Sequence, residues 1–222
     1  MSVERERYQG IVKELDLTNT KLVAVSKTKP IADIQALYDL GQRDFGENYV
    51  QELTGKAAQL PADIRWHFIG HLQSNKVKYI APFVHLIQVV DSLKLLQEIN
   101  KQALKSNRII GCLLQVHIAK EETKFGLDEK ELDELMNQIE KLQLINVRVT
   151  GLMGMASFSE DMNLVRSEFK SLKATFDKHA ALAIHDSRFT TLSMGMSSDY
   201  KLAVEEGSNM VRIGSLIFGE RN

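Results

Sequence analysis

The chain has 222 residues, of which 44% are hydrophobic and 26% charged, and its 28 basic and 29 acidic side chains give a net charge of −1. This ordinary globular composition argues against a disordered or fibrous chain, and the absence of a basic excess argues against a dedicated nucleic-acid-binding protein. The single cysteine, Cys112, excludes an internal disulfide and favours a reducing compartment. Because the charged N-terminus lacks the apolar core of a secretory signal, and no stretch reaches about 18 apolar residues, we expect a cytoplasmic protein without membrane segments.

Short apolar runs alternate with segments of helical periodicity along the whole chain. A helix at 3–15 comes first. Strand and helix pairs then follow at 22–26 and 33–40, 43–46 and 49–58, 65–69 and 75–81, 84–90 and 91–106, 109–118 and 128–141, 147–153 and 162–180, and 190–194 and 199–206, before a last strand at 210–213 and an exit segment from Leu216. Asp91 is the expected N-cap of the helix at 91–106.

The alternation of strands and helices predicts a parallel sheet with right-handed crossovers. The predicted strands are mostly continuous apolar runs, which indicates burial on both faces. Eight strands favour closure into a single (β/α)8 TIM barrel of the α/β class with an extra N-terminal helix, and 222 residues is near the lean end for that fold. A doubly wound open sheet is the alternative. No linker-like stretch divides the chain, so we predict one domain over residues 1–222.

The residues that follow each strand are the site candidates, because the active site of a TIM barrel lies at the C-terminal ends of its strands. Lys27 directly follows an apolar strand. A lysine amine must be unprotonated to attack a carbonyl, and burial lowers its pKa. A shift from about 10.4 to about 7–8 requires roughly 3–5 kcal/mol, which an apolar barrel mouth could supply. The alternative interpretation is a lysine whose amine reaches out to solvent at a strand end.

Small residues follow the last two strands, where TIM barrels commonly bind phosphate. Gly195 and Gly214 would let backbone N–H groups approach a ligand, and Ser193, Ser197 and Ser215 would add hydroxyl donors. Ordinary turns made of Gly and Ser are the alternative interpretation.

Other motifs give weaker signals. The chain has no GxGxxG, no GxxxxGK[ST] and no GxSxG sequence, so the usual fingerprints of dinucleotide, nucleoside-triphosphate and serine-hydrolase sites are missing. His67 and His71 are four residues apart but flank a strand end, so we predict no metal site. Cys112 lies within a strand and is expected in the core, and Lys124 is the second candidate for a reactive lysine.

Six segments of the sequence form a recognisable set. They are VAVSKTKP (23–30), FGENYVQE (45–52), HFIGHLQSNK (67–76), GLMGM (151–155), LSMGMS (192–197) and VRIG (211–214). Together they resemble the pyridoxal-phosphate homeostasis protein family, which is similar to the N-terminal barrel of alanine racemase standing alone. The resemblance covers nearly the full length. Ser215 stands where the family often has threonine, and it keeps the hydroxyl.

The resemblance implies pyridoxal 5′-phosphate (PLP) as the cofactor, held as a Schiff base on Lys27. Asn48 would lie against the cofactor ring, and Arg212 would face the pyridine nitrogen. A guanidinium stays protonated and can only donate there, which discourages carbanion chemistry. The phosphate would bind the amides and hydroxyls of Ser193, Gly195, Ser197, Gly214 and Ser215.

The implied function is PLP homeostasis and amino-acid balance rather than catalysis, so no catalytic residue is assigned. No tyrosine follows a strand in a clear catalytic role, and the chain ends at Asn222 without the second domain that brings a tyrosine in alanine racemase. A PLP-dependent amino-acid racemase, a sugar-phosphate enzyme and a pure interaction protein are the alternatives. We expect a monomer whose partners are PLP and, if it delivers the cofactor, PLP-dependent apoenzymes, with neither nucleic acid nor membrane as a partner.

Overall fold

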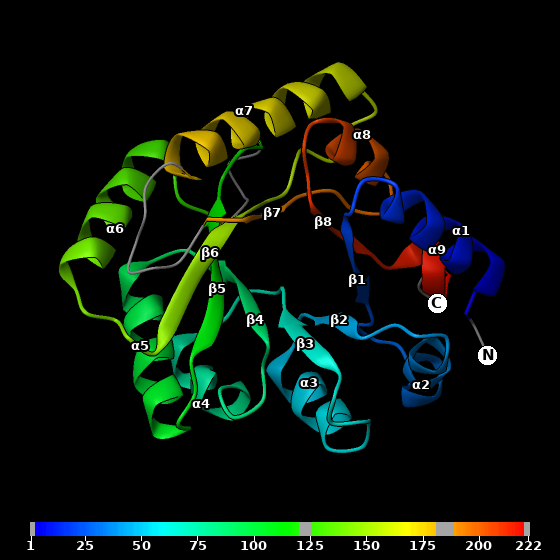
Figure 1. The fold of residues 1–222 in the computed structure, drawn as a ribbon, viewed down its shortest axis with the longest axis horizontal. Helices are drawn as coiled ribbons and strands as arrows, with labels where there is room; N and C mark the ends of the chain where they lie inside the picture. The colour runs from blue at the N-terminus through cyan, green and yellow to red at the C-terminus, as the bar shows by residue number, and fades with distance from the viewer. Residues whose placement is uncertain (1–2, 120–125, 181–188, 220–222) are drawn as a thin grey trace.

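The computed structural model of the protein describes residues 3–119, 126–180 and 189–219 (Figure 1). Its elements in chain order are α1 (Arg5–Asp16), β1 (Lys21–Val25), α2 (Ile31–Asp39), β2 (Asp44–Glu47), α3 (Val50–Ala57), β3 (Arg65–Phe68), η1 (Ser74–Lys76), α4 (Val77–Ile80), β4 (Leu86–Val90), α5 (Leu93–Lys105), β5 (Ile110–Val116), α6 (Glu129–Lys141), β6 (Val147–Gly154), α7 (Met162–Ala180), β7 (Thr191–Ser193), α8 (Tyr200–Glu205), β8 (Met210–Ile213) and α9 (Ser215–Phe218).

The eight strands form a closed barrel in sequence order, which confirms the predicted TIM barrel and excludes the open sheet. Closure is made by parallel pairing of the first and last strands, where Lys21 faces Met210 and Ala24 faces Ile213. In Figure 1 the helices surround this ring of strands, and α1 lies beside α9. The backbone N–H of Glu4 donates to the carbonyl of Ile217 at 2.9 Å, so the predicted N-terminal helix is tied to the exit of the barrel.

One local prediction is wrong, and one short helix was not predicted. Ser92, not Asp91, is the N-cap of α5, and its side chain accepts a hydrogen bond from the backbone N–H of Leu95. A serine hydroxyl serves as well as a carboxylate at this position, so the sequence alone could not choose between neighbours. The exit segment also forms one more short helix, α9, which begins at Ser215.

Apolar side chains fill most of the barrel and its contacts with the helices. Val23, Phe45, Phe68 and Ile87 are among the completely buried residues. Cys112 belongs to this core, as predicted, and burial raises the pKa of its thiol. Lys124 lies outside the described residues. Within those residues, no helix is both long and apolar enough to cross a membrane.

Candidate functional site

A cavity of about 570 Å³ opens at the C-terminal ends of the strands. This volume is within the range of about 300–1,000 Å³ that is usual for small-molecule sites. Six of the eight predicted site residues line it. They are Lys27, Asn48, Ser197, Arg212, Gly214 and Ser215. The loops after β1, β2, β7 and β8 therefore bring together residues that are up to 188 positions apart in the sequence.

Ser193 and Gly195, the other two predicted residues, do not line this cavity. Ser193 is completely buried; its hydroxyl donates to Gln88 Oε1 at 2.7 Å and accepts from Arg212 Nη1 at 2.6 Å. Gly195 has a φ of +97°, and an added Cβ would lie 2.6 Å from the Cβ of Ala203. Its carbonyl accepts the backbone N–H of Arg212 at 3.0 Å. Both residues therefore contact Arg212 instead of forming the cavity wall.

The backbone on both sides of Lys27 is held by a group of charged and polar side chains that was not predicted from the sequence. We call Ser26, Glu47, Glu52 and Lys56 the β1 clamp. Lys56 Nζ donates to the carbonyl of Ser26 at 2.7 Å, to Glu47 Oε1 at 2.8 Å and to Glu52 Oε1 at 2.6 Å. The Ser26 hydroxyl donates to Glu47 Oε1 at 2.6 Å. The clamp thus fixes the residue before Lys27 through both its side chain and its carbonyl.

The residue after Lys27 is held by the same clamp. The backbone N–H of Thr28 donates to Glu52 Oε1 at 2.6 Å. Thr28 has a φ of +64°, a conformation that threonine rarely adopts, so the contact with Glu52 helps to stabilise an unfavourable turn. Burial raises the pKa of Glu47, although the Lys56 ammonium opposes this shift. A glutamate at the end of a buried strand was the signal in the sequence that could have pointed to the clamp.

Arg212 is a buried cation on the inner wall of the cavity, 4% exposed. Its Nη2 donates to the carbonyl of Gly154 at 3.0 Å, and its Nη1 is bound by Ser193. Burial lowers its pKa to about 10, so the guanidinium stays protonated at neutral pH and can act only as a donor.

Asn48 offers the opposite chemistry, because its Oδ1 is a buried acceptor without a hydrogen-bond partner among the described residues. An unsatisfied buried polar atom is rare in folded proteins and requires an explanation. Gly70 packs directly behind it; a Cβ at Gly70 would lie 2.3 Å from the Asn48 carbonyl oxygen. A ligand that brings a donor to this wall would satisfy the Asn48 side chain.

The cavity has a hydroxyl-rich side and an apolar side. Ser197, Ser198 and Ser215 form the first, and Ser198 was not predicted. The Ser197 hydroxyl accepts the backbone N–H of Gly214 at 3.2 Å. The apolar side is formed by Ile69, Met155, Phe158 and Met196.

Lys27 and Lys29 are the two lysines among the described residues of the lining. Lys29 Nζ donates to the carbonyls of Phe218 and Gly219, at 2.9 and 3.3 Å, at the end of α9. Lys29 is therefore bound to the C-terminal end of the barrel, whereas Lys27 follows directly after Ser26 at the end of β1. Lys27 is half-buried, as expected for a lysine whose amine must reach into the cavity.

The two histidines considered for metal binding have different surroundings. His67 is completely buried in β3. His71 lines a separate cavity of about 230 Å³ that shares Asn48 with the main one. The spacing of four residues therefore does not bring His67 and His71 to one site.

The chain matches the family model described as "Alanine racemase, N-terminal domain" over residues 5–222. It is 42% identical to the pyridoxal phosphate homeostasis protein of Aquifex aeolicus over 202 residues, which cover 90% of this chain and 87% of that protein. It is 38% identical to the human pyridoxal phosphate homeostasis protein over 231 residues, which cover 98% of this chain and 84% of that protein.

Solved structures give the same picture. PipY of Synechococcus elongatus, with PLP bound, superposes with a TM-score of 0.86 at 35% identity, and the match covers 96% of this chain and 99% of PipY. Alanine racemase from Bartonella henselae, with covalently bound pyridoxal phosphate, superposes with a TM-score of 0.69 at 17% identity, over 99% of this chain and 61% of the racemase. At that identity the racemase shows a shared fold only.

Proposed function

Because the chain belongs to the pyridoxal phosphate homeostasis protein family, we propose that its barrel binds PLP in the cavity at the C-terminal ends of the strands, linked to Lys27 as a Schiff base. The observation that carries this proposal is the meeting of three groups in one cavity: the Lys27 amine, the buried Arg212 donor and the unsatisfied Asn48 acceptor. PLP offers an aldehyde, a ring nitrogen and a ring oxygen for these groups.

Each wall of the cavity has a part in this proposal. Lys27 would hold the cofactor through its aldehyde carbon, and the aldehyde oxygen would be lost as water. Arg212 would donate to the ring nitrogen, and the Asn48 amide would lie beside the ring oxygen. The phosphate lies against Ser197, Gly214 and Ser215, with Ser198 available as a further hydroxyl donor. Ser193 and Gly195, which were expected at the phosphate, act through Arg212. The apolar side covers the ring.

The charges of the lining favour a carrier over a racemase. The charged side chains that the structure describes in the cavity wall are Lys27, Lys29 and Arg212, all of them basic. A racemase needs an acid and a base on opposite faces of the substrate carbon, and the described lining of this cavity holds no carboxylate, histidine or tyrosine that could join Lys27 in these roles. We therefore propose that the protein holds PLP, as a monomer, and releases it to PLP-dependent apoenzymes without turnover of its own.

Titration of the purified chain with PLP tests the binding proposal. We expect saturable binding of one PLP per chain and a new absorbance band near the visible edge. Deuterium wash-in at the α-carbon of a broad amino-acid panel then separates carrier from racemase. The carrier predicts no exchange in PLP-loaded protein, and catalytic exchange with any amino acid would favour the racemase. Failure to bind PLP at all would leave the cavity to a different phosphorylated ligand.

A further inference from the structure

A line of buried polar side chains crosses the inside of the barrel below the cavity. We call it the interior network; its members are Asp44 in β2, His67 in β3, Gln88 in β4, Ser193 in β7 and Arg212 in β8. Each is at most 5% exposed. Barrel interiors are usually filled by branched apolar residues, and buried polar groups are tolerated when they are fully hydrogen-bonded. Five such residues in contact therefore require a reason beyond packing.

The hydrogen bonds of the network all run in one direction. Arg212 Nη1 donates to the Ser193 hydroxyl at 2.6 Å, and this hydroxyl donates to Gln88 Oε1 at 2.7 Å. Gln88 Nε2 lies 2.9 Å from His67 Nδ1, and His67 Nε2 lies 2.9 Å from Asp44 Oδ1. An amide nitrogen can only donate, so His67 Nδ1 accepts and its Nε2 carries the proton. Every member then has a partner of the right kind.

A flipped Gln88 amide would break this order. Its nitrogen would donate to the Ser193 hydroxyl, whose own proton would then lose its acceptor, and its oxygen would face the unprotonated Nδ1 of His67. A neutral His67 protonated at Nδ1 would repair that contact but would turn an unprotonated Nε2 toward the Asp44 carboxylate, so only a doubly protonated ring would satisfy both neighbours. Burial lowers the pKa of His67, although Asp44 opposes the shift and the nearby Lys21 and Arg65 cations add to it. The neutral ring therefore fixes the orientation of Gln88, and Gln88 fixes the Ser193 hydroxyl.

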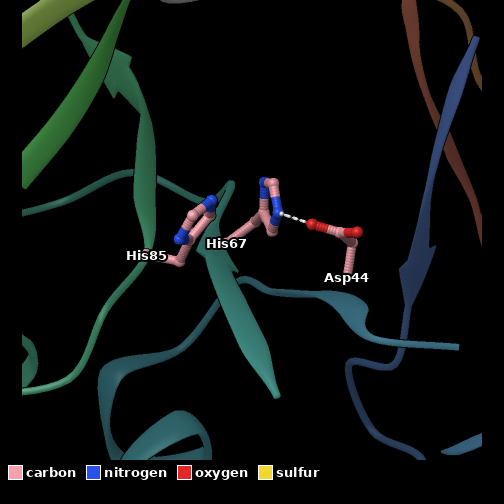
Figure 2. Close-up of side chains that lie close together, drawn as sticks. All are labelled: Asp44, His67 and His85. Carbon is pink, nitrogen blue, oxygen red and sulfur yellow. Dashed lines mark hydrogen bonds and ion pairs between the residues drawn. The ribbon is translucent and has the colours of Figure 1, made fainter. Parts of the chain in front are cut away.

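The far end of the network is anchored by Asp44. Arg65 donates to both carboxylate oxygens, from Nε at 2.9 Å and from Nη2 at 2.5 Å, and these contacts together with His67 hold the Asp44 pKa well below its usual range. Figure 2 shows the His67 ring between Asp44 and His85, with its Nε2 directed at the carboxylate.

Asp44, His67 and His85 also place their ligand atoms within 4.8 Å of one another, which raises the question of a metal site. The existing contacts favour the network instead. Both nitrogens of His67 and both oxygens of Asp44 are already hydrogen-bonded. A divalent cation would have to displace the Arg65 guanidinium and then remain beside that positive charge.

We propose that Asp44, His67, Gln88 and Ser193 are positioning residues that orient the Arg212 guanidinium toward the ligand cavity. The inference rests on the proposed function, since Arg212 is the group expected to meet the ring nitrogen of PLP. The network joins the base of the barrel to the cavity, so a change at Gln88, which does not line the cavity, should alter how Arg212 meets the cofactor.

The test compares Gln88→Leu with Gln115→Leu. Gln115 is a buried glutamine of the neighbouring strand β5 and lies outside the network, so the same substitution there controls for the loss of a buried amide. The first readout is the ¹⁵N–¹H NMR spectrum of the Arg212 guanidinium in the full chain without PLP. We expect separate Nη signals in the wild type and in Gln115→Leu, because the two Nη groups have different acceptors. In Gln88→Leu the Nη1 signals should shift, because the Ser193 hydroxyl that they contact loses its own acceptor.

The second readout is PLP itself. Gln88→Leu should bind PLP about tenfold more weakly, as expected for a disturbed buried hydrogen bond, and the absorption maximum of bound PLP should move. Gln115→Leu should keep the wild-type affinity for PLP and the wild-type absorption maximum. Three results would each overturn the proposal. Gln88→Leu could keep the wild-type Arg212 signals and PLP affinity, or both variants could show the same changes. A metal chelator could also change the Arg212 signals of the wild type. If the wild type binds no PLP but the Arg212 signals respond as described, the proposed function fails and the network stands.

Discussion

Replacing Lys27 by alanine is expected to abolish the visible band of bound PLP and to weaken PLP binding by about a hundredfold or more. The reason is the loss of the covalent link, which the hydroxyls of the cavity lining cannot replace. Absorption spectra and equilibrium dialysis at matched protein concentration measure the two effects. Lys27→Arg should behave in the same way as Lys27→Ala, because a guanidinium keeps the charge but does not form the link.

Lys29→Ala is the matched control for Lys27. Lys29 lines the same cavity from two residues further along the chain, and its amine is bound to the carbonyls of Phe218 and Gly219. We expect this variant to keep the band. A band that survives in Lys27→Ala and disappears in Lys29→Ala would mean that the wrong lysine has been assigned.

Replacing Lys56 by methionine should produce the largest loss of stability. Lys56 is 7% exposed, and its amine donates to Oε1 of Glu47, to Oε1 of Glu52 and to the carbonyl of Ser26. Removing one partner of a buried ion pair costs about 3–5 kcal/mol, because the remaining charge stays buried without compensation. For a chain of this size that corresponds to a fall in Tm of roughly 6–20 °C. Thermal unfolding followed by circular dichroism measures it.

The stability that Lys56→Met loses should depend on pH in one direction. Burial raises the pKa of Glu47 in the folded protein, and Lys56 opposes the rise. Without Lys56 the raised pKa should rise further, so the folded variant favours a protonated Glu47. A raised folded pKa gives stability that is present at low pH and lost as the pH rises through it. The deficit of Lys56→Met relative to wild type should therefore shrink in acid and grow toward neutral pH.

Two further variants separate the clamp from a general effect of losing a lysine. Lys201→Met removes an exposed ion pair with Glu14 and should change the Tm little. Adding Glu47→Gln to Lys56→Met removes the stranded charge and should restore part of the lost stability. A Tm for Lys56→Met equal to that of Lys201→Met would contradict the role of the β1 clamp.

The barrel could be predicted because its signal is local. Each strand is a short apolar run and each helix has its own periodicity, so the order of elements fixes the topology once the crossovers are right-handed. Lys27 could be proposed for the same reason, since it follows a strand, whereas the parts of Asn48 and Arg212 came from the family resemblance.

The β1 clamp and the interior network could not be predicted from local patterns. In the sequence Lys56 is typical of an ordinary helix residue, and its contact with Ser26 forms only in the folded chain. Ser193 was expected at the phosphate because it ends a strand, but its side chain contacts Gln88 and Arg212 inside the barrel, and how deep the end of a strand lies below the mouth is set by the closed barrel. Its partners Gln88 and Arg212 lie on other strands, so only the closed barrel brings the three residues together.

Borohydride reduction of the PLP-loaded protein, followed by peptide mass analysis, tests the central claim most directly. The account predicts that the visible band disappears on reduction and that one pyridoxyl-phosphate adduct is found, on the peptide that contains Lys27. An adduct confined to another lysine, or PLP that binds and leaves no adduct after reduction, would contradict it.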